Sequence, residues 1–151
     1  MSRADNAKNY FAEGYNCCQA VVLAFSDIVK VEKDQLLLIS SSFGGGFGRL
    51  REVCGAFSGM NVILGLVEGY TTTDGQNKLN HYANIRALAE KFKEANGGSI
   101  ICRELIAGTE KLSSENPAVR TEEYKTKRPC GEIVYNATQI LEDYLKEKGK
   151  L

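Results

Sequence analysis

The chain has 151 residues, of which 43% are hydrophobic and 25% charged, and its 19 basic side chains balance 19 acidic ones. These totals are those of one globular domain, residues 1–151, and the neutral balance argues against a protein that binds nucleic acid or membranes through a basic surface. No apolar run is long enough to span a membrane, and the first residues lack the apolar core of a signal peptide. We therefore expect a cytoplasmic protein whose thiols are kept reduced.

The first periodic segment runs from Asp5 to about Val29, where bulky side chains recur every three or four residues. This pattern predicts one amphipathic helix. Cys18 falls within the bulky stripe, whereas Cys17 falls on a neighbouring face that is mostly small at its middle. We therefore expect Cys17 to be the thiol that other groups can approach.

A short helix is expected next, with Asp34 near its start and residues 36–39 buried. It ends at the sequence SSSFGGGFG (40–48), because glycine is costly inside a helix. This glycine-rich segment lacks the GK[ST] of a phosphate-binding loop, so we interpret it as a bend between helices.

A further helix is predicted from about Val53 through Val67, and it contains two glycines four residues apart. Gly55 and Gly59 share one face of this helix and would let another backbone pack closely against it. Close packing alone would explain the two glycines, but Cys54 stands directly in front of them. The same bare face would keep the surroundings of that thiol clear for other helices or for a cofactor.

The second half of the chain predicts a long helix from about Gln76 to Ala95, after a turn or cap at 71–75. A short helix capped by Ser99, a polar loop over 107–128 with at most one helical turn, and a last helix behind Pro129 follow. The inner face expected for the long helix consists of Tyr82, Ile85, Leu88, Ala89, Phe92 and Ala95. The predicted fold is all-α, a bundle of about five helices.

Three of the five cysteines fall at predicted helix N-termini: Cys54, Cys102 and Cys130. The unpaired amides and the helix dipole there favour the thiolate, which is the form that a metal ligand, a redox thiol or a nucleophile needs. The other interpretation of each cysteine is a small buried residue. The long spacings exclude zinc fingers, CxxC motifs and ferredoxin loops, so only the fold could bring these thiols to a shared site.

The other candidate residues give weaker indications of function than the cysteines do. His81 is the only histidine and lies on a polar stretch, where a surface position is the simpler interpretation. Arg51 and Glu52 flank Cys54 and could tune a thiolate, and Arg128 is close enough in sequence to act on Cys130. Neither paired carboxylates nor a Ser-His-Asp arrangement is evident, so a hydrolase is not expected.

Five stretches, in this order, resemble the C_GCAxxG_C_C family of redox-active proteins: GYNCCQAVVLAF (14–25), GGGFG (44–48), CGAFSG (54–59), FKEANGGSIICRELI (92–106) and RPCGEIV (128–134). The similarity spans nearly the whole chain. The family's four cysteines fall here on Cys17, Cys54, Cys102 and Cys130, called the cysteine set below, and its CGAxxG element includes Gly55, Ala56 and Gly59. The resemblance implies a small helical protein that is redox-active or binds an iron–sulfur cluster. A related domain accompanies haem in certain cytochromes, whereas this chain lacks haem motifs and adds Cys18.

Two classes of function follow from the sequence. The first is a redox protein, an electron carrier or oxidoreductase component, in which the cysteine set binds an iron–sulfur cluster or exchanges disulfides without a metal. The second is a non-catalytic helical module that binds structural zinc or a partner protein. We expect a redox protein as partner, and the apolar glycine-rich segment could support a homodimer. Neither nucleic acid nor a membrane is an expected partner.

Overall fold

The computed structural model describes the whole chain except residues 113–115 and 118, and the described residues form helices with one isolated antiparallel bridge between Val53 and Ile101. The helices are α1 (Arg3–Glu13), α2 (Cys17–Ala24), α3 (Lys33–Ser40), α4 (Gly44–Phe47), α5 (Gly55–Glu68), α6 (Gly75–Ala95), α7 (Cys102–Leu105), the 3-10 helix η1 (Glu110–Leu112), α8 (Glu122–Lys127) and α9 (Cys130–Glu147). The all-α prediction is confirmed. The helix count exceeds the expected five because the N-terminal helix is divided and short helices form in the loops.

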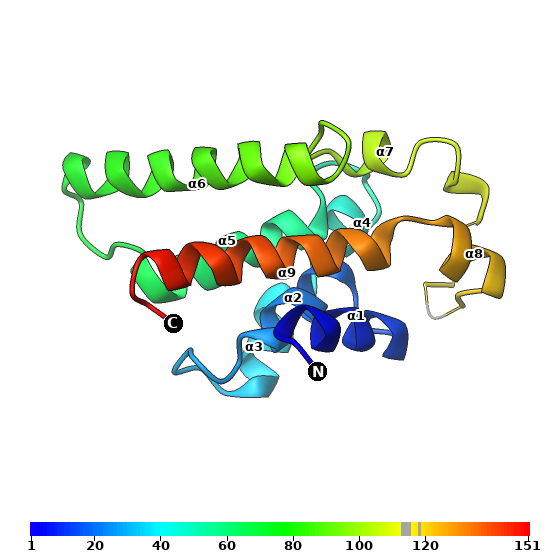
Figure 1. Cartoon of the computed structure of the whole chain (residues 1–151), viewed down its shortest axis with the longest axis horizontal. Helices are drawn as coiled ribbons and strands as arrows, with labels where there is room; N and C mark the ends of the chain where they lie inside the picture. Colours follow the sequence, from blue (N-terminus) through cyan, green and yellow to red (C-terminus); the bar gives the residue numbers. More distant parts are fainter. Residues whose placement is uncertain (113–115, 118) are drawn as a thin grey trace.

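Helices α5 and α9 run through the middle of the molecule, with α6 on one side and α1, α2 and α3 on the other (Figure 1). Helix α2 packs on α5, and α1 packs on α9, which also contacts α2, α5 and α6. The largest fully buried side chains are Phe25, Phe92, Leu36, Met60, Ile63, Leu64, Leu88, Ile106, Leu141 and Leu145. These helices enclose one apolar core, and the amino ends of α2, α5 and α9 supply part of the candidate site.

The single helix predicted over Asp5–Val29 is wrong, because the chain breaks between α1 and α2. Gly14 ends α1 in the left-handed conformation with φ 119°. Asn16 then caps α2: its side chain accepts from the Gln19 amide at 2.8 Å, and the Gln19 side chain accepts from the Asn16 amide at 3.2 Å. This reciprocal capping box starts a new helix at Cys17.

The close approach predicted at Gly55 and Gly59 is confirmed between α5 and α2. A β-carbon added at Gly59 would lie 2.9 Å from the Cβ of Val21 and 3.0 Å from the carbonyl oxygen of Cys18. Both distances are shorter than a carbon side chain tolerates, so glycine is required for this packing. Cys18 is fully buried in the core beside the contact, as its position in the bulky stripe predicted.

Two predictions of burial are wrong. Of the residues 36–39 on α3, Leu36 is buried, but Leu38 is 67% exposed and Ile39 is 47% exposed, because α3 is a peripheral helix that packs mainly against α2. On α6, Tyr82 is 44% exposed. Helix α6 lies at the outside of the bundle (Figure 1), and only Leu88 and Phe92 are fully covered there.

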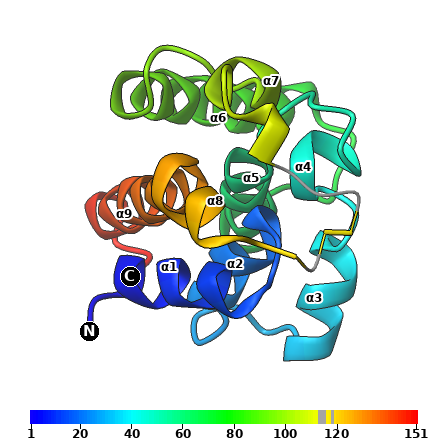
Figure 2. The same ribbon diagram turned by 90° about the vertical axis from the view of Figure 1, so that its right-hand side faces the viewer.

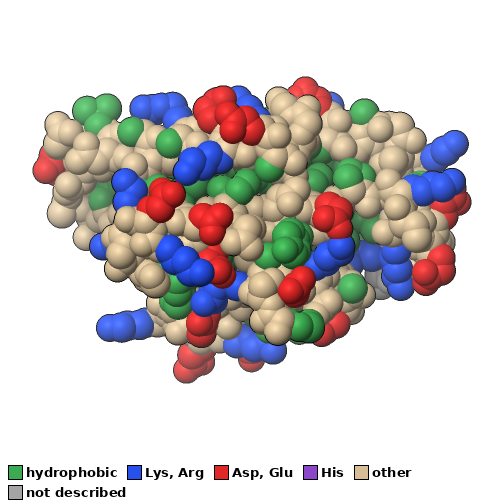
Figure 3. Space-filling model, viewed as in Figure 1, with side chains coloured by type: hydrophobic (Ala, Val, Ile, Leu, Met, Phe, Trp, Pro, Cys, Tyr) green, Lys and Arg blue, Asp and Glu red, His purple; other side chains and the backbone are tan. Residues whose placement is uncertain are grey.

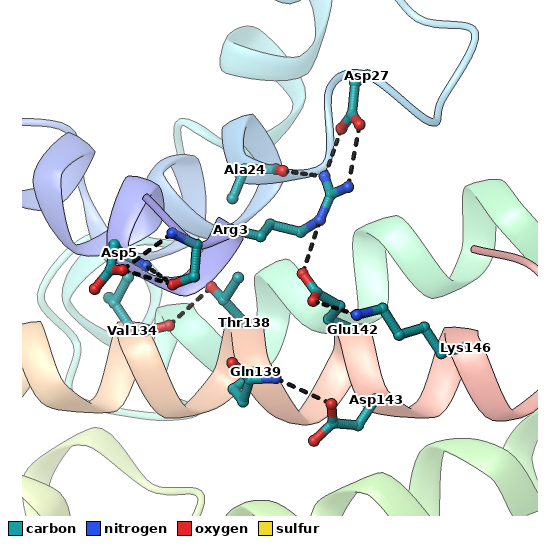
Figure 4. Close-up of polar contacts among 11 residues, drawn as sticks. Arg3, Asp5, Ala24, Asp27, Val134, Thr138, Gln139, Glu142, Asp143 and Lys146 are labelled. Atoms are coloured by element: carbon teal, nitrogen blue, oxygen red, sulfur yellow. Dashed lines mark hydrogen bonds and ion pairs between the residues drawn. The ribbon is translucent and has the colours of Figure 1, made fainter.

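A polar network fastens the N-terminus to the C-terminal helix (Figure 4). The Arg3 guanidinium pairs with Asp27, donates to the Ala24 carbonyl oxygen at 2.6 Å and donates to Glu142 on α9 at 3.0 Å. Lys146 also donates to Glu142, at 2.9 Å. The network links α1, the end of α2 and α9.

The surface carries charges of both signs, and Figure 3 shows them interspersed over the face drawn there. This pattern agrees with the neutral balance of 19 basic and 19 acidic side chains. In the described part of the chain, no helix combines the length and the apolar character that a bilayer crossing requires.

Candidate functional site

The whole cysteine set lines one cavity of about 360 Å³. Cys17, Cys102 and Cys130 are the first residues of α2, α7 and α9, and Cys54 is the residue that precedes α5. Figure 2 looks onto the end of the molecule where α7 and α8 lie. The fold therefore brings together, from four helix starts, the four thiols that the sequence singled out.

Backbone pairing before α5 and α7 fixes two of these thiols next to each other. The Cys54 amide donates to the Ile100 carbonyl oxygen at 2.8 Å, and the Cys102 amide donates to the Glu52 carbonyl oxygen at 2.6 Å. These bonds flank the isolated bridge between Val53 and Ile101. Two helix starts that are distant in sequence are thus joined by their leading segments.

The glycine-rich segment forms part of the site, in addition to the bend between helices that the sequence indicated. Gly46 has φ 69°, and a β-carbon there would lie 2.8 Å from the Cβ of Cys102 and 2.7 Å from the Glu52 amide nitrogen. A β-carbon at Gly44 would lie 2.5 Å from the Cβ of Asn16, the capping residue of α2. The segment therefore packs between the starts of α2 and α7 because it has no side chains there.

Gly55 gives Cys17 its place beside α5. A β-carbon at Gly55 would lie 2.8 Å from the Phe43 carbonyl oxygen and 3.2 Å from the Cβ of Cys17. The space that the CGAxxG element leaves empty is thus taken by α2 and by the chain before α4. The glycine face therefore admits another helix, as the sequence predicted, and Cys17 is the thiol that lies against it.

Cys17 and Cys130 are in direct contact, because the Cys17 thiol donates a hydrogen bond to the Cys130 sulfur. This bond is the largest cause that lowers the pKa of Cys130 to about 7, with further contributions from Arg128, the Tyr124 hydroxyl and Arg120, against the opposing effect of burial. Donation to Cys130 and burial raise the pKa of Cys17. Both residues are partly exposed as a whole, and neither cysteine forms a disulfide.

Burial is the largest influence on the pKa values of Cys54 and Cys18. Burial raises the pKa of Cys54 to about 12, although the amides of Ala56 and Phe57 in the first turn of α5 act to lower it. The expectation that the helix start favours a Cys54 thiolate is therefore wrong for the free thiol, because desolvation is the larger effect. Burial likewise raises the pKa of Cys18 to about 12.

Among the described lining residues none is acidic, and four are arginines: Arg49, Arg51, Arg120 and Arg128. Arg51 donates through Nη1 to the Cys102 sulfur at 3.7 Å. Arg120 donates to the carbonyl oxygens of Phe11 and Tyr15, and its guanidinium lies 3.9 Å from the centre of the Phe11 ring. The predicted influence of the fourth, Arg128, on Cys130 is confirmed, since it lowers the pKa of that thiol.

Sequence reasoning missed Arg120 and Tyr124 as cavity residues. Both belong to the polar segment 107–128, which we interpreted as a loop, and residues 113–115 and 118 of that prediction lie outside the described structure. Arg120 lies before α8 and Tyr124 lies within it, and Thr121 caps this short helix by accepting from the Tyr124 amide at 3.1 Å. The threonine cap was the available signal.

The side chains of His81 and Glu52, which the sequence also raised, do not line the cavity that the cysteine set lines. His81 lines a second cavity of about 370 Å³ with Glu68, Tyr70 and other polar residues, and no described residue lining it is a cysteine. Glu52 pairs through its carboxylate with Arg103 at 2.6 Å. Neither residue points to a role in thiol chemistry.

Four thiols are a donor set that a zinc ion or an iron–sulfur cluster can take. Among the residues that the structure describes, no three Cys, His, Asp or Glu side chains are grouped closely enough to hold one metal ion. Tetrahedral zinc holds each sulfur at about 2.3 Å, which draws four sulfurs tightly together. An iron–sulfur cluster also takes four thiolates and carries net negative charge, which the arginines that line the cavity would offset.

A sequence model of the family described as "Putative redox-active protein (C_GCAxxG_C_C)" matches residues 15–144. This range contains every cysteine of the set and both glycines of the CGAxxG element. No curated protein and no solved structure matches the chain.

Proposed function

We propose that this chain, which belongs to the C_GCAxxG_C_C family of redox-active proteins, transfers electrons through a single centre held by the cysteine set. The observation that carries the proposal is the convergence of four thiols from four helix starts on one cavity. Helix starts supply unpaired amides and positive dipole ends, which stabilise thiolate ligands. In this reading the centre is an iron–sulfur cluster.

The chain's own residues would hold and tune such a cluster. Cys17, Cys54, Cys102 and Cys130 are the ligands, and a bound cluster supplies reversible one-electron chemistry. Hydrogen bonds to the ligand sulfurs and burial set the potential of such a centre. Arg51 already donates to the Cys102 sulfur at 3.7 Å, so it is the side chain best placed to tune the potential.

A second candidate, thiol–disulfide exchange, is favoured by the hydrogen bond between Cys17 and Cys130. The Cys130 thiolate would attack a disulfide of a partner protein, forming a mixed disulfide and releasing one partner thiolate. The Cys17 thiol would then lose its proton and attack the Cys130 sulfur, releasing the second partner thiolate. The partner disulfide gains two electrons, and the Cys17–Cys130 pair is oxidised.

We also propose a partner, a location and an oligomeric state for the protein. A redox partner protein supplies or receives the electrons, and the cytoplasm is the proposed location because it keeps thiols reduced. A homodimer stays a proposal that sedimentation of the purified chain would test. A structural zinc module is the competing function, and the metal analysis below separates it from the redox proposals.

The proposal is tested by iron, zinc and acid-labile sulfide analysis of anaerobically purified protein. Four Cys→Ser variants of the cysteine set are compared with Cys18→Ala, a control that removes the buried neighbouring thiol. Iron and sulfide in similar amounts, kept in Cys18→Ala and lost in each Ser variant, are expected. Zinc with the same dependence would replace the redox function by a structural one.

Metal-free protein would shift the assignment to the dithiol. In that case a mild oxidant should form a Cys17–Cys130 disulfide, detected by mass spectrometry of the digested protein. Metal-free protein that forms no such disulfide would contradict both redox candidates.

A further inference from the structure

Arg128 is a buried cation whose guanidinium forms no ion pair with a carboxylate in the described structure. Its residue is 6% exposed, and among the described ion pairs none includes it. Its Nη2 donates to the Thr109 carbonyl oxygen at 2.6 Å, and the guanidinium lies 4.7 Å from the centre of the Tyr124 ring. Buried charges are ordinarily paired, because an isolated one is strongly disfavoured away from water.

The Nε of Arg128 is fully buried and has no hydrogen-bond acceptor among the described residues. Thr109 fixes one end of the guanidinium and Tyr124 covers its face, so the group is held in one orientation with a donor unused. A guanidinium presents its N–H groups as a planar fork that matches two oxygens of a carboxylate, phosphate or sulfate. An oxyanion in the cavity that Arg128 lines would supply a charge opposite to that of its guanidinium.

The thiols themselves do not fill this role. Arg51 donates a hydrogen bond to the Cys102 sulfur at 3.7 Å, which shows the kind of contact that an arginine in this cavity makes with a cysteine. Arg128 lies two residues from Cys130 and lowers its pKa through charge, yet its Nε has no sulfur acceptor. Arg128 nevertheless lines the cavity, so its guanidinium borders the space beside the cysteine set, although its Nε is covered.

The surroundings restrict the size and the sign of that group. The cavity is about 360 Å³ and is shared with four thiols, so only a small molecule fits beside them. Arg120 adds a second positive charge, and among the described lining residues there is no carboxylate to repel an anion. Leu105, Ile106 and Ile133 line the same cavity and would cover an apolar portion of the ligand.

We infer that the cavity contains a binding subsite for a small oxyanion, in which Arg128 is the principal ligand-binding residue and Arg120 contributes charge. The subsite lies beside the cysteine set, so a bound anion would be next to the proposed redox centre. The inference goes beyond the electron-transfer proposal and does not depend on which centre the thiols form.

The test is equilibrium dialysis of the full chain, purified anaerobically, against radiolabelled sulfate and radiolabelled acetate at low ionic strength. Wild-type protein is expected to bind at least one of the two saturably, and neutral acetamide should not compete. Arg128→Gln should weaken binding at least tenfold, because it removes both the charge and the fork. Arg128→Lys keeps the charge but loses the planar fork, so its affinity should lie between those of wild type and Arg128→Gln. This variant serves as the test if Arg128→Gln does not fold.

Arg86→Gln is the matched control, because it removes the same charge from an exposed position on α6. It should leave the dissociation constant within twofold of wild type. Binding of acetate alone identifies a carboxylate site, and binding of sulfate alone identifies a site for tetrahedral oxyanions. No saturable binding of either probe, or equal weakening in Arg86→Gln and Arg128→Gln, would overturn the inference. Metal and sulfide contents of the same samples report the redox centre separately.

Discussion

Replacing Gly59 by alanine should destabilise the protein through a collision between α5 and α2. The new methyl would lie 2.9 Å from the Cβ of Val21 and 3.0 Å from the Cys18 carbonyl oxygen. Both neighbours are fixed, one because it is joined directly to the backbone and the other because it belongs to it. The helices must therefore separate, and α2 begins with Cys17, so the strain acts on the cysteine set.

The magnitude follows from two opposed effects. Alanine is favoured over glycine inside a helix by about 1 kcal/mol. Overpacking a close contact costs about 1–3 kcal/mol, and rigid neighbours place Gly59→Ala towards the upper end. The control is Gly65→Ala on the same helix, where a β-carbon meets nothing within 4 Å. It gains the helical preference without the collision, so the difference between the two variants isolates the steric cost.

Urea unfolding of both variants measures that difference. We expect the free energy of unfolding of Gly59→Ala to lie about 2–3 kcal/mol below that of Gly65→Ala. For a protein of this size, each kcal/mol also moves the melting temperature by about 2–4 °C. Equal stabilities of the two variants would refute the role assigned to the glycine face.

Three further outcomes are expected. Asn16→Ala removes the cap of α2 and should lower the free energy of unfolding by about 1 kcal/mol in urea titrations. In reduced, metal-free protein, iodoacetamide should label Cys130 with a midpoint near pH 7 while Cys54, whose pKa is about 12, stays unmodified near neutral pH; peptide mass spectrometry that finds the two labelled together would contradict this. Arg3→Met breaks charged hydrogen bonds at a side chain that is 17% exposed and should cost about 2 kcal/mol, whereas the exposed Lys146→Met should cost less than about 1 kcal/mol; comparable losses in both would count against the network.

The sequence predicts the helices better than it predicts where they start. The periodic pattern across 5–29 continues through the break, because residues on both sides of it face the same core. The capping signal Asn16-x-x-Gln19 and the glycine at 14 were present but weaker than the periodicity. As a result, three of the four helix-start thiols could be predicted, and Cys17 was placed on the correct face but inside a helix.

The assembly of the site depends on contacts that no local pattern reports. Cys54 and Cys102 are aligned by backbone bonds between segments about 50 residues apart in sequence. Arg120 reaches the cavity from a polar segment whose weak periodicity predicts only a loop. The pKa of Cys54 was mispredicted for the same reason, since burial is set by the tertiary fold and outweighs the helix start.

The most direct test of the central claim is an equilibrium redox titration of the anaerobically purified protein, followed by visible absorption. A cysteine set that holds an iron–sulfur cluster should give a reversible one-electron transition, with a Nernst slope of about 59 mV per decade. A protein without a visible transition, whose free-thiol content titrates with about 30 mV per decade, the value for a two-electron couple, would contradict the cluster and favour the Cys17–Cys130 dithiol. A protein with no transition in either visible absorption or free-thiol content would contradict the proposed redox function.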